Sequence, residues 1–194
     1  MNKKSLDQKT VRKLIKEGRN NGKTDQEIYN ELSQKFYDKK TIALLISGTA
    51  TNEKKKKYKN YNNILLGLIG FFGLFKIFHA FNLIEETEDI WFFLLASIII
   101  LLFAGYFMYG IAKYEGATYR ICGFFTILIF LQSSFWQHIW NLENVIEILI
   151  NVFVSVAIIF LSFYLDKKIF PNYSYRKMKK DNNGEYILIE KQIT

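Results

Sequence analysis

Six polar or ionisable residues that could support chemistry lie inside the long apolar stretches of this 194-residue chain. They are Lys76, His79, Gln132, Ser133, Glu147 and Asn151. Ionisable groups inside a membrane are costly, and they often mark ion or proton pathways. At 1.5 Å per helical residue, Lys76 lies about 12 Å inside the outer end of its apolar stretch. His79 lies nearer that end on the same face, Gln132 and Ser133 reach a similar depth, and Glu147 and Asn151 share one face of the last apolar stretch. We therefore expect an intramembrane polar layer that several helices supply in the outer half of the bundle.

Two interpretations of this layer compete. In the first, Lys76 faces the interior and pairs with Glu147, either directly or through an amide or water. A lysine in mid-membrane costs about 2.5 to 3.5 kcal/mol, so an interior partner is favoured over exposure to lipid. In the second, the layer is a polar conduit or a ligand pocket. We favour pairing and keep the conduit as the alternative.

Signatures of catalysis are missing from the sequence. There is no "HExxH", no "GxSxG" and no phosphate loop "GxxxxGK[ST]". Gly67, Gly70 and Gly73 recur every third residue inside an apolar stretch, a spacing that suits close helix packing. The single cysteine, Cys122, cannot form an intramolecular disulfide. We therefore expect no enzyme, no catalytic residue, no metal site and no cofactor.

The elements that must position the polar layer are four apolar segments, at about 63–84, 90–112, 120–137 and 145–165. About 20 apolar residues cross a hydrocarbon core of roughly 30 Å as a helix. Backbone groups in lipid must be satisfied internally, which favours helices, and the 10-residue alternating segments of a barrel are absent. The sequence therefore predicts an all-α membrane protein with a four-transmembrane-helix bundle at 63–165.

The distribution of charge predicts the orientation of the bundle. Residues 1–61 hold 16 Lys and Arg, residues 113–120 hold two and residues 166–194 hold seven, whereas the turns at 85–89 and 137–144 hold none. Cytoplasmic segments carry the excess of Lys and Arg, so both termini are expected in the cytoplasm, with the lipid bilayer as a partner. This also explains the net charge of +8 without nucleic acid. The expected headgroup and topology anchors are Lys54, Lys55, Lys56, Lys57, Lys167 and Lys168.

Residues 1–50 carry the start and stop signals of three short helices, and a basic linker is expected to follow at 51–62. Ser5 with Gln8, and Thr24 with Glu27, form capping-box patterns, and Asp38 can cap a third short helix. Three amphipathic helices must bury their apolar stripes on each other or on a partner. In the tail at 166–194, "NNG" between two short apolar runs predicts a β-hairpin. A lone hairpin is marginal, so it should pack on the helical module or on another subunit.

The stretch "IKEGRNNGKTDQEIYNELSQKFYDKKTIALLI" resembles the UBA-like three-helix segments that precede membrane spans in many small bacterial multi-span membrane proteins. The shared features are a glycine in the first turn, the "TDQEI" start and a leucine four residues after that isoleucine. The resemblance covers about residues 5–48. It implies an interaction or packing module, with no catalytic residues, in a multi-pass protein of the bacterial inner membrane.

Two functions are consistent with this organisation. We favour a membrane-anchored interaction or regulatory protein that presents cytoplasmic surfaces to a protein partner. The alternative is an oligomeric ion-conducting pore or membrane-perturbing effector that uses the outer polar layer. Four helices leave little room for a pathway within one copy, so a homo-oligomer is expected.

Overall fold

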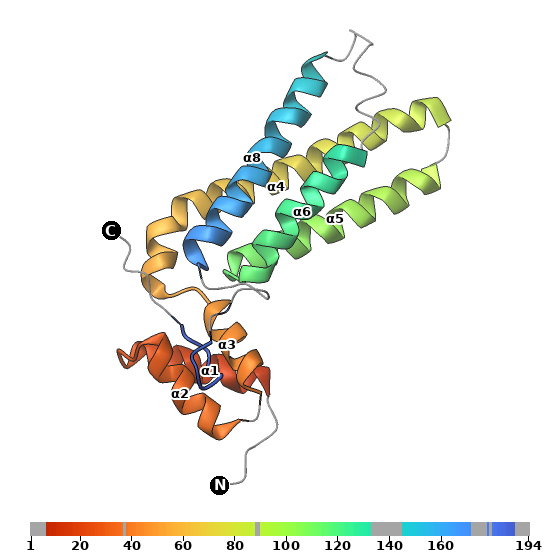
Figure 1. The fold of residues 1–194 in the computed structure, drawn as a ribbon. Helices are drawn as coiled ribbons and strands as arrows, with labels where there is room; N and C mark the ends of the chain where they lie inside the picture. Colours follow the sequence, from red (N-terminus) through yellow and green to blue (C-terminus); the bar gives the residue numbers. More distant parts are fainter. Residues whose placement is uncertain are drawn as a thin grey trace. The chain divides into compact units, whose positions relative to one another are not determined.

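The computed structural model describes residues 7–36, 38–87, 90–132, 145–171, 178 and 180–188, without the side chains of 79, 80, 82–87, 92 and 132. Over these residues the chain is all-helical (Figure 1). It divides into two compact units, one of Met1–Lys54 with Ile169–Thr194 and one of Lys55–Lys168. The two ends of the chain thus belong to one unit, and the apolar segments belong to the other.

The first unit contains three short helices, α1 (Gln8–Asn20), α2 (Asp25–Lys35) and α3 (Lys39–Ser47). The predicted capping box at Thr24 is confirmed, because its side chain accepts from the Glu27 amide and the Glu27 carboxylate accepts from the Thr24 amide. Asp38 caps α3 as predicted. At α1 the cap is Asp7 rather than the predicted Ser5. The Asp7 carboxylate has two oxygens and accepts from two backbone amides at once, which a hydroxyl does less readily.

The three helices share one apolar core. Gly18 makes the contact of α1 with α2 close, since a Cβ there would lie 2.8 Å from Ile28 Cγ1. Arg19 joins the helix ends: its guanidinium binds the Asp25 carboxylate and donates to the carbonyls of Ile46 and Thr49. The buried helical side chains of the core are Val11, Ile15, Ile28, Tyr29, Leu32, Phe36, Ile42, Ala43 and Ile46.

The end of the chain completes this core. Tyr186 and Leu188 are buried in it, and Met178 packs against it. The predicted two-stranded hairpin is not confirmed: the described residues hold a turn closed by one antiparallel bridge between Lys180 and Tyr186 and no strand, and most of the first expected strand lies outside them. Gly184 takes a φ of +79° in this turn, as the "NNG" signal predicts. A second strand is unnecessary because a side chain of α2, described below, takes up the backbone groups of the tail.

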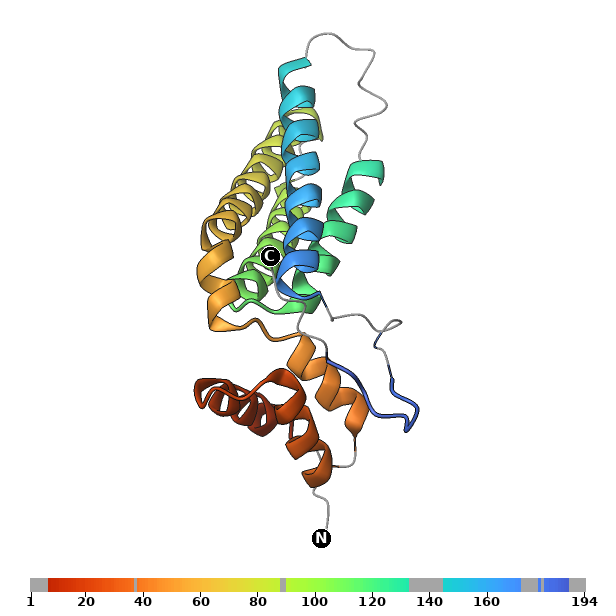
Figure 2. The same cartoon turned by 60° about the vertical axis from the view of Figure 1, so that its left-hand side comes forward.

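The second unit contains α4 (Asn52–Thr87), α5 (Ile90–Ala112), α6 (Gly116–Gln132) and α8 (Val145–Ile169). Figures 1 and 2 both show α5 and α6 side by side. Because α4 begins at Asn52, the expected basic linker at 51–62 is largely the first part of this helix. The third expected segment, 120–137, corresponds to α6, and its last residues lie outside the described part of the chain.

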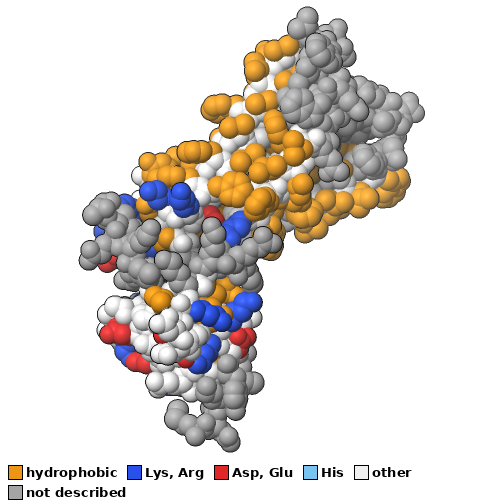
Figure 3. Space-filling model, viewed as in Figure 1, with side chains coloured by type: hydrophobic (Ala, Val, Ile, Leu, Met, Phe, Trp, Pro, Cys, Tyr) orange, Lys and Arg blue, Asp and Glu red, His pale blue; other side chains and the backbone are white. Residues whose placement is uncertain are grey.

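Among the described residues, three helices are long and apolar enough to cross a membrane, within Asn52–Phe78, Phe93–Ala112 and Val145–Ile169. Gly116–Leu131 is a shorter apolar helix. At most 28% of any of the three apolar windows is buried inside the unit. Large hydrophobic side chains therefore cover the outside of this unit, as the space-filling view shows (Figure 3). A surface with so many exposed apolar side chains fits contact with the hydrocarbon core of a membrane.

Candidate functional site

One candidate site is formed by α2 and the tail. The Gln26 side chain binds the tail backbone twice: its Nε2 donates to the Tyr186 carbonyl at 3.2 Å, and its Oε1 accepts from the Leu188 amide at 2.7 Å. Backbone groups of residues i and i+2 lie on the same edge of an extended chain. A single amide therefore takes the place of a neighbouring strand, and it does so without reading the side chains of the tail.

Tyr29 and Lys39 bind the tail next to Gln26. The Tyr29 hydroxyl donates to Glu185 Oε2 at 2.9 Å and accepts from the Tyr186 amide at 3.3 Å. Its ring meets the Tyr186 ring edge-on, with the centroids 6.2 Å apart. The Lys39 ammonium pairs with the other Glu185 oxygen. The tail thus presents an acidic, an aromatic and an aliphatic side chain, Glu185, Tyr186 and Leu188, to complementary groups.

The protonation state of Tyr29 suits this arrangement. Burial raises the pKa of Tyr29 to about 12, and the hydrogen bond from the Tyr186 amide opposes the rise only in part. The hydroxyl therefore keeps its proton near neutral pH and can donate to Glu185. An ionised Tyr29 would instead repel that carboxylate.

A buried polar cluster joins the four helices of the second unit. The Tyr119 hydroxyl of α6 donates to Asn62 Oδ1 of α4, and Asn62 Nδ2 donates to the Ile111 carbonyl of α5 at 3.4 Å. Arg120 donates twice to Asp166 Oδ2 of α8, from Nε at 3.1 Å and from Nη2 at 2.8 Å. Such bonds hold apolar helices in one register, because a buried polar group without a partner is costly.

Sequence reasoning missed this cluster. Asn62 stands just ahead of the first expected apolar segment and Asp166 just after the last, so both were assigned to the polar flanks. The available signal was spacing: Ser155, Ser162 and Asp166 follow one another at seven and four residues, which places them on one helix face. Each carries a buried oxygen that finds no hydrogen-bond partner in the structure: Ser155 Oγ, Ser162 Oγ and Asp166 Oδ1.

The helices of the second unit also line a cavity of about 210 Å³. Its walls come from α4, α5 and α6, with Ile158 from α8. Lys76 is the one charged residue among its described lining residues, and the Lys76 ammonium lies 5.2 Å from the centroid of the buried Phe72 ring. Within the described residues, no ion pair joins Lys76 to Glu147, so their expected pairing has no support there.

The rest of the expected polar layer is only partly described. Glu147 and Asn151 are half-buried on α8, one turn apart. His79 and Gln132 belong to α4 and α6, but their side chains lie outside the described set, as does the whole of Ser133. The structure therefore brings Lys76 to a cavity and leaves the layer as a unit untested.

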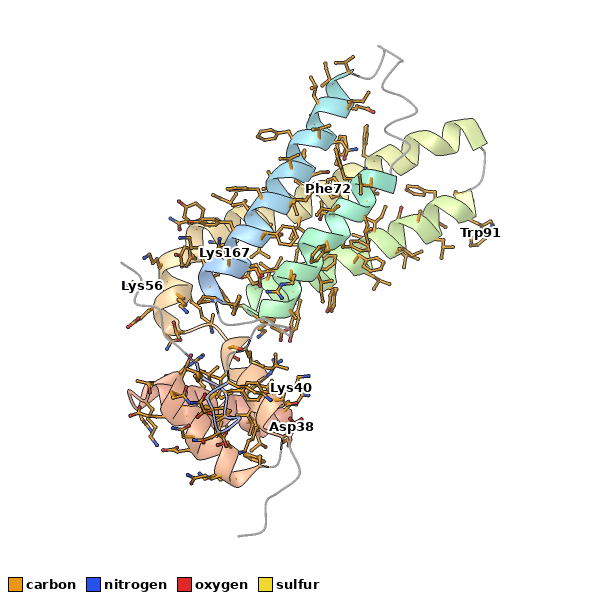
Figure 4. All side chains as sticks on the ribbon, in the orientation of Figure 1. Asp38, Lys40, Lys56, Phe72, Trp91 and Lys167 are labelled. Atoms are coloured by element: carbon orange, nitrogen blue, oxygen red, sulfur yellow. The ribbon has the colours of Figure 1, made fainter. Side chains whose placement is uncertain are left out.

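The expected anchors lie at one end of the second unit. Figure 4 shows Lys56, on the first turns of α4, at the same end as Lys167 on the last turns of α8. Lys167 and Lys168 are exposed, and the Lys168 ammonium lies 6.0 Å from the Tyr164 ring centroid. Trp91 lies at the opposite end. Lysines at one end suit the cytoplasmic interface of a membrane, and a tryptophan at the other end suits an interface as well.

Comparison with protein-family models, with curated proteins and with solved structures gave no match to this chain. The class of protein is therefore defined by the fold alone. Over its described residues it is an all-helical protein with three helices long and apolar enough to span a membrane. Its two chain ends form a small unit of their own.

Proposed function

We propose that this chain is a membrane-anchored interaction protein whose small unit binds an extended segment of a partner in the place of its own tail. The observation that carries the proposal is the double hydrogen bond from Gln26 to the backbone of Tyr186 and Leu188. Binding through main-chain groups supplies affinity for any extended peptide, and pockets for alternate side chains supply specificity. A partner would offer an acidic residue, an aromatic one and, two residues later, an aliphatic one.

The location follows from the charge pattern. We place both termini in the cytoplasm of a bacterium, with four spans in the inner membrane and α6 continuing as the span expected at 120–137. The basic end formed by α4 and α8 then faces the cytoplasm, as the positive-inside rule favours. The first unit becomes the UBA-like interaction module implied by the sequence resemblance. Copies of the chain are expected to associate through the apolar outer faces of the helices.

Release of the tail is the event on which this function depends. Tyr186 and Leu188 are held by the contacts to Gln26, Tyr29 and Lys39 described above, and one backbone bridge closes their turn. A docked segment of this kind can open locally at a lower free energy than the unfolding of the core that it covers. The tail is also tethered, so it competes with a partner at an effective concentration of the order of millimolar. A partner therefore gains access when it is abundant or when the tail is held elsewhere.

The test is binding in trans. The full chain carrying Tyr186→Ala and Leu188→Ala, in lipid nanodiscs, should bind a fluorescent peptide spanning residues 178–190, measured by anisotropy. Adding Gln26→Ala should weaken binding about thirtyfold, because two hydrogen bonds of about 1 kcal/mol each are lost. Gln34→Ala, at an exposed position of the same helix, is the matched control and should change nothing. Equal binding by the Gln26 and Gln34 variants would refute the proposed site.

A second candidate, the oligomeric pore, is favoured by the inward face of α8. Ser155 Oγ, Ser162 Oγ and Asp166 Oδ1 are buried oxygens that find no hydrogen-bond partner among the described residues, and polar groups of this kind can line an aqueous path. Ion flux into liposomes that is abolished by Ser162→Ala or by Glu147→Gln would support the pore. Liposomes that stay silent with the purified chain would eliminate it.

A further inference from the structure

The cavity of the second unit has the size and lining of a ligand site. Its volume of about 210 Å³ exceeds the roughly 150 Å³ of a dry apolar cavity that admits benzene. The lining is aliphatic and aromatic, apart from Lys76, Cys122 and Thr126. Thr126 is already satisfied, since its hydroxyl donates to the Cys122 carbonyl at 2.9 Å. Among the lining residues that the structure describes, the Lys76 ammonium is therefore the polar group left for a ligand.

Lys76 lacks an anionic partner in the described part of the chain. Its ammonium rests against the Phe72 ring, and no hydrogen bond or ion pair to a described acceptor accompanies that contact. A cation next to an apolar cavity is costly unless it is paired. The cation–π contact relieves part of this cost and keeps the ammonium at the cavity wall. Charge complementarity then calls for a ligand with an acidic group.

The depth of Lys76 fixes how such a ligand would lie. Thirteen residues separate the start of the apolar segment at Asn63 from Lys76, which at 1.5 Å per residue is about 20 Å of a hydrocarbon core of roughly 30 Å. Lys76 thus lies in the half of the bilayer away from the basic end, where its long side chain can extend toward an acidic headgroup of that half. The α4 lining runs from Ile69 to Lys76, so the cavity extends roughly 10 Å from the ammonium toward the bilayer centre.

We propose that this cavity binds a single-chain acidic amphiphile, a long-chain carboxylate taken from the bilayer. The carboxylate pairs with Lys76, and the chain passes Phe72 to end among the α5 and α6 side chains. A free fatty acid fits better than an anionic phospholipid, because the volume accommodates part of one chain and not two. This site is independent of the tail site on the first unit.

The test uses a palmitate analogue with a diazirine on its chain, added to the full chain in phosphatidylcholine nanodiscs. After irradiation, mass spectrometry should find cross-links in residues 99–107 and 122–129. Palmitate should compete with the labelling, whereas hexadecanol, which has the same chain without the acid, should not. Equal competition by the alcohol would overturn the proposal. Competition by phosphatidylglycerol but not by palmitate would overturn the single-chain ligand.

Variants add a second line of evidence. Lys76→Met should lower the labelling about tenfold or more, and Lys76→Arg should preserve it, because the charge is kept. Ile129→Phe should lower it by filling the cavity. The controls are Lys113→Met, a lysine that lies over the Tyr109 ring outside the cavity, and Leu128→Phe on the exposed side of α6. Labelling that is unchanged in both Lys76→Met and Ile129→Phe would overturn the proposal.

Discussion

At the scale of single residues, one carbonyl oxygen organises the packing of three helices. The Ile111 carbonyl accepts from Asn62 Nδ2, and the Tyr119 hydroxyl lies 3.2 Å from it. Asn62 and Tyr119 are both almost completely buried, at 2% and 0% exposed. Hydrogen bonds between apolar helices are worth little individually, but the loss of one partner leaves the other unsatisfied.

Tyr119→Phe should therefore destabilise the second unit by about 1 to 3 kcal/mol, the cost of leaving Asn62 Oδ1 buried without a donor. Adding Asn62→Leu should recover part of the loss, since the Ile111 carbonyl still accepts from the Tyr114 amide. Thermal unfolding in detergent measures both effects. Tyr109→Phe, at a 64% exposed position, is the control and should stay within about 0.5 kcal/mol of the parent. Strictly additive losses would show that Asn62 and Tyr119 do not interact.

Sequence reasoning selected Lys76 correctly as an unusual residue but assigned it an unsupported partner. A lysine inside an apolar segment is visible in the sequence because its cost is high. The surroundings of Lys76 depend on which face of α4 contacts α5 and α6. Packing between the helices decides this, and because these helices carry apolar residues on all sides, the sequence pattern does not reveal that face. The Lys76–Glu147 pair was inferred from depth alone, and depth does not specify which way a side chain points.

At the scale of elements, the helix caps were predictable because each cap is formed by residues that are close in the sequence. The capping box at Thr24 and the cap at Asp38 were predicted because each depends on residues within three positions. The hairpin is not confirmed, and the described part of the tail binds Gln26 through its backbone, at a separation of 160 to 162 residues that no local pattern reveals. The same turn residues therefore close a turn without forming a ladder.

The cap of α3 gives a prediction about pH. Hydrogen bonds from the Thr41 hydroxyl and amide hold the pKa of Asp38 below its usual value of 3.8. The charged cap therefore contributes its full stability above that value, and the contribution is lost as the pH falls through the lower, folded-state pKa. NMR of the labelled chain should show the Thr41 amide titrating with a midpoint below 3.8.

Asp38→Asn is the matched control for this titration. The asparagine keeps an acceptor for the Thr41 amide but has no proton to gain, so the amide should not titrate in this range. A Thr41 midpoint at or above 3.8 in the parent chain would contradict the capping account.

At the scale of the whole molecule, the apolar segments were predictable and the assembly of the chain ends was not. Three helices long enough to cross a membrane follow from hydropathy, because about 20 apolar residues in succession leave few alternatives. That the tail completes the core of the first three helices could be stated only as one of two options. The buried side chains of the tail, Tyr186 and Leu188, form too short an apolar pattern to predict which surface the tail packs on.

Orientation is testable by cysteine labelling. In a Cys122→Ala background, cysteines at Glu86 and Asn141 should react with a membrane-impermeant reagent in intact cells. A cysteine at Lys56 should react only after the cells are opened, because the lysines of this end favour the cytoplasmic side. Reaction at Lys56 in intact cells would reverse the orientation and remove the small unit from the cytoplasm.

The most direct test of the interaction account measures whether the tail can leave its site. Spin labels at Lys35→Cys and Asn183→Cys, in the Cys122→Ala background, report the distance between α2 and the tail by pulsed electron resonance in nanodiscs. Peptide 178–190, added above the millimolar effective concentration of the tethered tail, should replace the short distance with a broad, longer distribution. The same peptide with Tyr186 and Leu188 replaced by alanine should leave the short distance in place. A distance that stays short at saturating peptide would make the tail a permanent part of the core and contradict the proposed function.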